Sequence, residues 1–175
     1  MCKEESHVLD VIPEEDQAWC VLHTRPRCEK KLVQFCEEHR IQTYLPLKKS
    51  VHHYGMRKRS FLVPLFTGYT FCISDASNRF QLRQNRYVAN LLEVYDPETL
   101  VAQLKQIRRA LESEDMLTVS PYLEKGCRVL INKGPLKGVE GIIKVVKRKE
   151  KIVLNVDMIQ QAVVIEIDHS YLVVA

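Results

Sequence analysis

Cationic side chains gather in three stretches of the sequence and could bind phosphate groups. The stretch KKSVHHYGMRKRS, residues 48–60, carries five Lys or Arg residues, two His residues and no acid. RFQLRQNR adds Arg79, Arg83 and Arg86, and KVVKRKEK forms the third cluster. Such clusters are typical of surfaces that contact nucleic acids, although most basic runs are simply solvated faces. Charge alone therefore makes nucleic-acid binding a candidate function.

Aromatic side chains form a second group, in the segment LFTGYTFCI. Phe66, Tyr69 and Phe71 lie close together there. Aromatic side chains give a binding surface large, rigid contact area at a small entropic cost, and a tyrosine hydroxyl adds a polar group. Aromatic residues that alternate on a strand are also common in plain hydrophobic cores. The pattern itself leaves both interpretations open.

No set of residues is spaced for catalysis or metal binding. The sequence has no recognisable phosphate-binding loop and no nucleophile with a neighbouring base, so the pair His52 and His53 has no partners for catalysis. The six cysteines include no C-x-x-C pair, which argues against a zinc site and a disulfide framework. We therefore predict a protein that is not an enzyme, has no cofactor or metal, and keeps buried, reduced thiols.

The composition fits a soluble globular protein. Hydrophobic residues make up 46%, charged residues 27%, and the net charge is +4. No apolar run approaches the roughly 20 residues that a membrane span needs. Residues 1–16 are acidic and lack the basic start and apolar core of a secretory signal, so we interpret them as a flexible acidic leader. With the reduced thiols, this favours a cytoplasmic protein without a membrane partner. We expect a monomer.

Residues 17–112 have the pattern of an α+β domain. AWCVLH indicates a strand, followed by a helix with Thr24 as its cap and Pro26 in its first turn. IQTYLPL and YTFCI indicate strands on either side of the basic segment, which turns at Gly55. A short helix in SDASNRFQL, a strand in YVANLLEVY and a helix capped by Asp96 follow. The order β-α-β-β-α-β-α predicts an antiparallel sheet with helices packed on one face.

The rest of the chain changes character. Residues 113–122 lose all periodicity, which is typical of a linker. Residues 123–175 contain short consecutive β-rich runs, which would close most economically as a small barrel. Three of the six glycines lie within the run from Val129 to Val146. We expect turns at Gly134 and Gly138, and a sharp bend or bulge at Gly141.

Two parts of the sequence resemble one family. RVLINKGPLKGVEGIIKVV resembles the KOW motif, in which Gly-Pro follows a strand and a strand glycine lies six residues after the proline. WCVLHTRPRCEKKL, FLVPLFTGYTFCI and NRYVANLLEV resemble, in that order, the NusG N-terminal domain. The chain is therefore identified as a member of the NusG family of transcription elongation factors. The resemblance implies an α+β N-terminal domain, a linker and a C-terminal SH3-like KOW β-barrel.

The resemblance also implies a polymerase-binding site. In this family an apolar pocket of the N-terminal domain receives the tip of the β′ clamp helices of RNA polymerase. The positions that match it are Phe66, Tyr69 and Phe71, with Trp19 and Tyr44 as neighbours.

A further implied site is a basic edge for the non-template DNA strand, as in specialised RfaH-like members. Cations beside stacking rings suit single-stranded DNA, and His23 or Tyr87 could stack. Solvent-facing helix charges are the alternative interpretation. The matching positions and their neighbours in sequence are Arg25, Arg27, Lys30, Lys31, Arg83 and Arg86.

The KOW domain is expected to recruit the second partner. Ile159 stands where general NusG has a phenylalanine, in the loop that meets Rho or a small-subunit ribosomal protein. The isoleucine favours a specialised antiterminator, resembling RfaH or the paralogues of polysaccharide gene clusters. The β-branched strands favour a permanent barrel and domains that stay open. Two other functions remain: a ribosome-associated KOW protein that binds RNA, and a general NusG acting with Rho.

Overall fold

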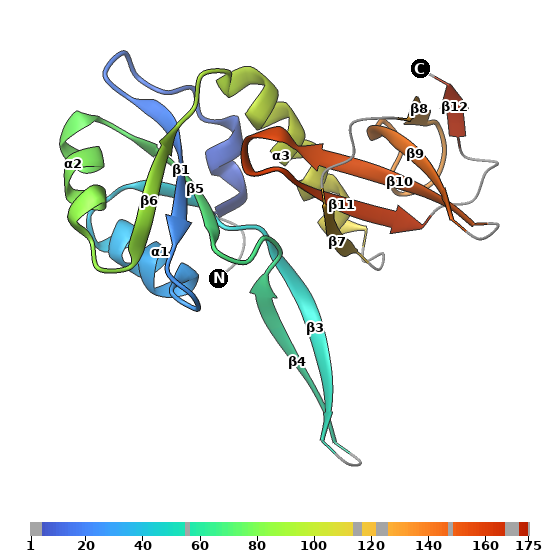
Figure 1. Ribbon diagram of the computed structural model, residues 1–175, viewed down its shortest axis with the longest axis horizontal. Coiled ribbons are helices and arrows are strands. Elements are labelled where there is room, and N and C mark those ends of the chain that lie inside the picture. Colours follow the sequence, from blue (N-terminus) through green and yellow to red (C-terminus); the bar gives the residue numbers. More distant parts are fainter. Residues whose placement is uncertain are drawn as a thin grey trace. The chain divides into compact units, whose positions relative to one another are not determined.

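The computed structural model divides the chain into two compact units, Met1–Pro97 and Glu98–Ala175 (Figure 1). The division falls before the last long helix, whereas the sequence suggested a boundary after residue 112. The described residues are 5–54, 57–113, 117–121, 126–146, 149–166 and 172–174.

The first unit is built on a four-stranded antiparallel sheet in the order β2-β5-β1-β6 (Figure 1). The central pair is β1 with β5, in a register that places Cys20 opposite Cys72. Two helices follow β1 and β5 in the sequence. The elements are β1 (Ala18–Thr24), α1 (Glu29–Glu38), β2 (Gln42–Tyr44), β5 (Tyr69–Ser74), α2 (Ala76–Gln84) and β6 (Val88–Glu93).

Both helices pack on the same face of this sheet. Side chains alternate between the two faces along a strand, so Cys20 and Leu22 of β1 point to one face together. They form one buried cluster with Leu32 of α1, Leu82 of α2 and further side chains of the sheet. The predicted antiparallel sheet with helices on one face is therefore confirmed.

The start of α1 differs from the sequence prediction. Thr24 is the last residue of β1 and pairs with Val88, and its side-chain oxygen is buried without a hydrogen-bond partner. The helix begins only at Glu29, because Arg27 turns the chain with φ 61°. The capping role of Thr24 and the helical position of Pro26 were thus wrong.

Between β2 and β5 the chain forms a long hairpin of β3 (Leu47–Tyr54) and β4 (Arg57–Pro64). It is a separate two-stranded sheet that extends away from the main sheet of the first unit (Figure 1). Pairing runs from Leu47 opposite Pro64 to Tyr54 opposite Arg57, as expected for a hairpin. The predicted turn residue, Gly55, lies outside the described residues.

The N-terminal segment includes a short helix. Residues Glu5–Asp10 form a 3-10 helix, η1, which packs against β2. Its Val8 and Leu9 are buried, with Leu9 only 1% exposed. The expectation of a flexible leader was therefore wrong for this stretch, because two apolar side chains find a place in the core.

The second unit contains helix α3 and six antiparallel strands in the order β12-β8-β9-β10-β11-β7 (Figure 1). Among the described residues no pairing joins the edge strands β12 and β7, so the expected closed barrel is not observed. One strand, β7, falls within the predicted linker. The elements are α3 (Pro97–Glu112), β7 (Thr118–Pro121), β8 (Cys127–Ile131), β9 (Glu140–Val146), β10 (Lys149–Val156), η2 (Asp157–Ile159), β11 (Gln161–Glu166) and β12 (Leu172–Val174).

Glycine is required at two positions of the second unit for different structural reasons. Gly138 has φ 85°, a left-handed conformation that side chains other than glycine's strain to adopt. Gly141 lies inside β9, in continuous register with Val129 and without the expected bulge. A Cβ atom there would lie 2.3 Å from Cγ2 of Ile152, so glycine is needed for space.

The helices of the described residues are too short or too polar to cross a lipid bilayer.

Candidate functional site

The loop before β5, residues 65–68, is tied to the end of β1 and the start of α1. The Gly68 amide donates to Oε1 of Glu29 at 2.8 Å, and the Thr24 amide donates to the Gly68 carbonyl at 2.8 Å. Glu29 is 4% exposed, so this hydrogen bond lies inside the protein. Gly68 has φ 84°, which permits the close turn. These contacts fix where the chain enters β5.

Four of the five predicted aromatic residues lie on the sheet face opposite α1 and α2, and the fifth, Phe66, lies in the loop before β5. Trp19 alternates with the core-facing residues of β1, and Phe71 does so on β5. Tyr44 of β2 lies opposite Phe71, with ring centroids 6.4 Å apart. Tyr69 stacks against His23 at 5.1 Å between ring centroids. The structure thus brings these rings together on one face.

Most of these rings are buried. Phe66 and Phe71 are 0% exposed, Trp19 is 2% exposed and Tyr44 is 5% exposed. Tyr69 is half-buried. Among the described residues these rings are therefore mostly closed off from solvent, and a cavity of about 190 Å³ borders Trp19 together with Tyr95. Whether these rings bind a partner stays a prediction.

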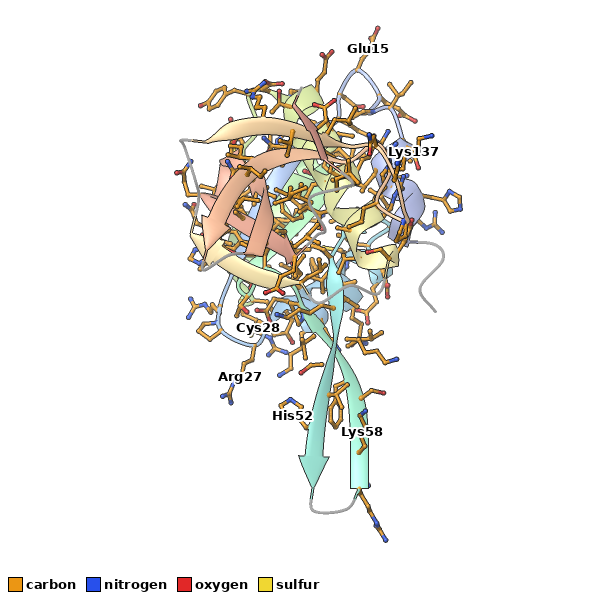
Figure 2. The ribbon with its side chains drawn as sticks, turned by 90° about the vertical axis from the view of Figure 1, so that its right-hand side faces the viewer. Glu15, Arg27, Cys28, His52, Lys58 and Lys137 are labelled. Carbon is orange, nitrogen blue, oxygen red and sulfur yellow. The ribbon has the colours of Figure 1, made fainter. Side chains whose placement is uncertain are left out.

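Two of the predicted cations lie side by side at one end of the sheet. The Arg25 amide donates to the Tyr87 carbonyl at 2.9 Å, which joins the loop after β1 to the loop before β6. The guanidinium of Arg86 lies 4.9 Å from the centre of the Tyr87 ring and donates to its hydroxyl at 2.7 Å. Arg27 lies in the same loop as Arg25 and points away from the sheet (Figure 2). This edge therefore combines exposed cations with a ring.

The other predicted cations have different surroundings. Arg83 forms an ion pair with Glu93 at 2.7 Å, which balances much of its charge. Lys31 is exposed on α1, whereas Lys30 donates to the Leu62 carbonyl at the base of the hairpin, at 2.6 Å. The basic edge is thus narrower than the sequence suggested.

One protein family matches the chain, over residues 17–104 and therefore over just over half of its length. Its description is transcription termination factor nusG. The chain belongs to the NusG family. The match includes every strand of the sheet that carries the aromatic face and the basic edge. No curated protein sequence matches the chain.

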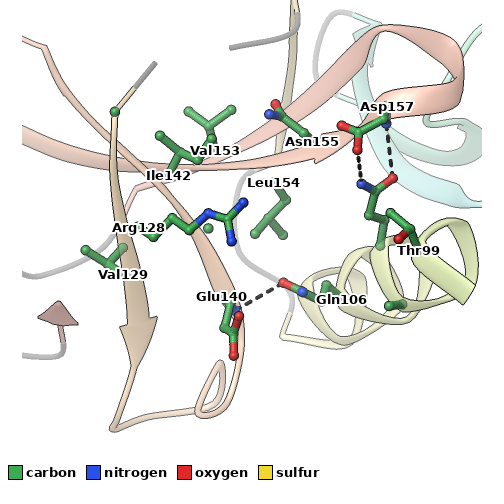
Figure 3. Close-up of a pocket in the computed structure, with 14 residues that line it drawn as sticks. Thr99, Gln106, Arg128, Val129, Glu140, Ile142, Val153, Leu154, Asn155 and Asp157 are labelled. Atoms are coloured by element: carbon green, nitrogen blue, oxygen red, sulfur yellow. Dashed lines mark hydrogen bonds between the residues drawn. The ribbon is translucent and has the colours of Figure 1, made fainter. Parts of the chain in front are cut away.

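In the second unit of this NusG-family protein, Ile159 lies in η2 and is only 6% exposed. The neighbouring Asp157 is held by Gln103 of α3 through two hydrogen bonds: its carboxylate accepts from the side-chain amide at 2.6 Å, and its own amide donates back at 3.0 Å. A cavity of about 390 Å³ lies beside these contacts, between α3 and strands β8 to β10 (Figure 3). The residue expected to meet a partner is therefore not displayed on the surface.

Buried thiols lie under the helices, away from both surfaces. Burial, followed by the nearby Glu37 carboxylate, raises the pKa of Cys36 to about 12. Burial also raises the pKa of Cys72 well above its usual value, and the neighbouring Cys20 and Cys36 add to this effect. These three cysteines are free and buried, as expected; Cys28 is free and partly exposed.

Sequence reasoning missed the residues that position the site. The link from Glu29 to Gly68 spans 39 residues, and no local pattern announces it. A glycine between Thr67 and Tyr69 was the available signal for a sharp turn. The η1 segment was missed because its two buried apolar residues are surrounded by acids.

Proposed function

We propose that this NusG-family protein binds the β′ clamp helices of RNA polymerase and promotes continued elongation by suppressing pausing or termination. The observation that carries the proposal is the aromatic face of the first unit, which gathers Trp19, Tyr44, Tyr69 and Phe71 on one side of the sheet. A helical tip presents apolar side chains, and clustered rings are suited to receive them.

The contact begins at the accessible edge of this face. Tyr69 is half-buried and stacks on the exposed His23, so these two rings can meet a partner without rearrangement. Phe66 and Phe71 are fully buried. Deeper insertion of the clamp helices therefore requires the residues that cover these two rings to move.

The basic edge serves as the second contact, with the non-template DNA strand. Arg25, Arg27 and Arg86 supply exposed cations, and the ring of Tyr87 lies beside them. Phosphate contacts from arginine combined with a stacking ring are the usual means of holding single-stranded DNA. Arg83 contributes less, because Glu93 balances its charge.

The second unit acts as a KOW domain that recruits a further partner. Its Gly134-Pro135 turn and strand residue Gly141 carry the motif. Ile159 favours a small-subunit ribosomal protein over Rho. The hydrogen bonds between Gln103 and Asp157 would have to open for that loop to be displayed.

Transcription in vitro over a template with a strong pause, with and without Rho, tests the function. We expect faster and more complete runoff with the wild-type protein. The Tyr69→Ala variant should lose this effect, whereas Phe80→Ala should keep it, because Phe80 is 63% exposed on α2, on the other side of the sheet from the aromatic face. If runoff is the same with and without the wild-type protein, the proposed function is wrong.

A further inference from the structure

The hairpin of β3 and β4 is free of acidic residues and open on both faces. Residues 47–64 contain five Lys or Arg residues and no Asp or Glu. In β4, six successive residues from Arg57 to Leu62 are exposed. Because neighbouring residues of a strand point to opposite faces, six exposed residues in a row mean that neither face is covered.

The register places cations on both faces. Arg57 and Arg59 point to one face together with Lys48, because residues that lie opposite each other in an antiparallel pair share a face. Lys49 and Lys58 point to the other face. Among the described residues, no ion pair balances any of these five charges. Figure 2 shows two hairpin residues, His52 and Lys58.

We propose that this hairpin binds double-stranded DNA by lying in a groove between the two phosphate backbones. The major groove of B-form DNA is about 12 Å wide and admits a two-stranded β-ribbon. A ribbon that lies between the two phosphate backbones has one backbone on each side. Each face of the ribbon then meets one backbone, so the cations of both faces find phosphates to contact. A single strand lies along one face at a time and would leave half of the cations unused.

The dimensions and the anchoring of the hairpin support this occupant. Strands of eight residues are about 26 Å long at the usual rise per residue, which is enough to cross a groove. Lys30 of α1 holds the base of the hairpin through the Leu62 carbonyl at 2.6 Å. Double-stranded RNA fits less well, because its deep, narrow major groove excludes such an element.

Binding of the full-length protein to a 20-base-pair DNA duplex, measured by fluorescence anisotropy at several salt concentrations, tests the proposal. Two pair variants each remove two cations from one face: Arg57→Gln with Arg59→Gln, which leaves Lys48 on that face, and Lys49→Gln with Lys58→Gln. Each pair should weaken duplex binding roughly tenfold and lower the salt dependence by about two phosphate contacts. The charge-conserving pair Arg57→Lys with Arg59→Lys should bind almost as wild type.

Control measurements show whether the hairpin itself, rather than the basic edge or the protein's overall positive charge, binds the duplex. Lys133→Gln with Lys137→Gln removes two exposed cations of the second unit and should leave duplex binding nearly unchanged. A single-stranded DNA probe should respond little to the hairpin variants. The proposal is overturned if only one of the two hairpin pair variants weakens duplex DNA binding, or if the control pair weakens it as much as they do. It is also overturned if the hairpin variants weaken binding to single-stranded DNA or duplex RNA as much as binding to duplex DNA. Polymerase is absent from the assay, so the result is independent of the proposed clamp contact.

Discussion

At the scale of single residues, chemistry is decided by what surrounds each charge or thiol. Arg83 and Arg86 are three positions apart in a basic stretch, yet one is paired with Glu93 and the other lies over a tyrosine ring. Both were predicted equally as nucleic-acid contacts. Because their surroundings differ, we expect the two arginines to contribute differently to DNA binding.

Single-stranded DNA binding should reveal this difference. Arg86→Ala should weaken binding roughly threefold to tenfold, because one unpaired cation beside a ring is lost. Arg83→Ala should have a smaller effect. Glu93→Gln should strengthen binding, since it frees the Arg83 guanidinium. Anisotropy titrations at low salt measure all three variants, and equal losses for the two arginines would contradict the assignment.

The buried thiol of Cys36 should make stability depend on alkaline pH. Its pKa is about 12 in the folded protein, against a usual value of 9.0. Below pH 9 the thiol is protonated in both states, so its contribution is fully present. As pH rises from 9 toward 12, only the unfolded state loses the proton, and the free energy of unfolding falls by up to about 1.4 kcal/mol for each pH unit.

Urea unfolding at pH 8 and pH 10.5 measures this contribution. The difference between the two pH values should be smaller in Cys36→Ala than in the wild type. Cys28→Ala is the control, because this thiol is partly exposed, and its difference should match the wild type. An unchanged difference in Cys36→Ala would show that the thiol does not resist ionisation.

At the scale of elements, long-range contacts position the aromatic face. The carboxylate of Glu29 accepts the Gly68 amide inside the protein. Glu29→Ala leaves that amide without a partner and should cost about 1–3 kcal/mol of unfolding free energy. Glu29→Gln keeps an acceptor oxygen and should cost less. Denaturant melts of the two variants measure the effect; if Gln is as damaging as Ala, the hydrogen bond is not what holds the loop.

Strand β9 offers a second test at this scale. Gly141→Ala places a Cβ atom 2.9 Å from the Val153 carbonyl oxygen and 2.3 Å from Ile152, so β9 and β10 must shift apart. Such overpacking costs about 1–3 kcal/mol. Thermal unfolding measures the loss.

Gly126→Ala is a comparison for the same crowding. A Cβ atom there would lie 2.2 Å from Cγ2 of Ile142, so this variant should also be destabilised. If Gly141→Ala melts like the wild type, the close approach of the two strands does not constrain this position.

Local patterns predicted the elements but not the contacts between distant ones. Alternating and helical spacing located the sheet of the first unit and its helices, and Asp75 caps α2 by accepting the Asn78 amide at 2.7 Å. The start of α1 was misplaced because Thr24 is held in β1 by its pairing with Val88. Burial of the aromatic rings could not be predicted either, since alternation shows that two residues share a face but not what covers it.

At the scale of the whole molecule, the family match and the aromatic face support one account. The match covers the first unit from β1 onward and ends within α3. Sequence analysis identified the family and the strands of the second unit. Closure of those strands as a barrel is not seen in the part of the chain that the structure describes, because edge pairing depends on contacts that β-propensity does not encode.

Binding of isolated β′ clamp helices to the full-length protein tests the central claim most directly. Isothermal titration should give a specific complex with the wild type and with Phe80→Ala, which alters an exposed ring on α2. Binding should be at least roughly tenfold weaker with Tyr69→Ala, because an accessible ring that a partner covers is a typical interface hot spot. Circular dichroism of each variant checks that the fold is kept. No binding by the wild type, or equal binding by a folded Tyr69→Ala, would contradict the account.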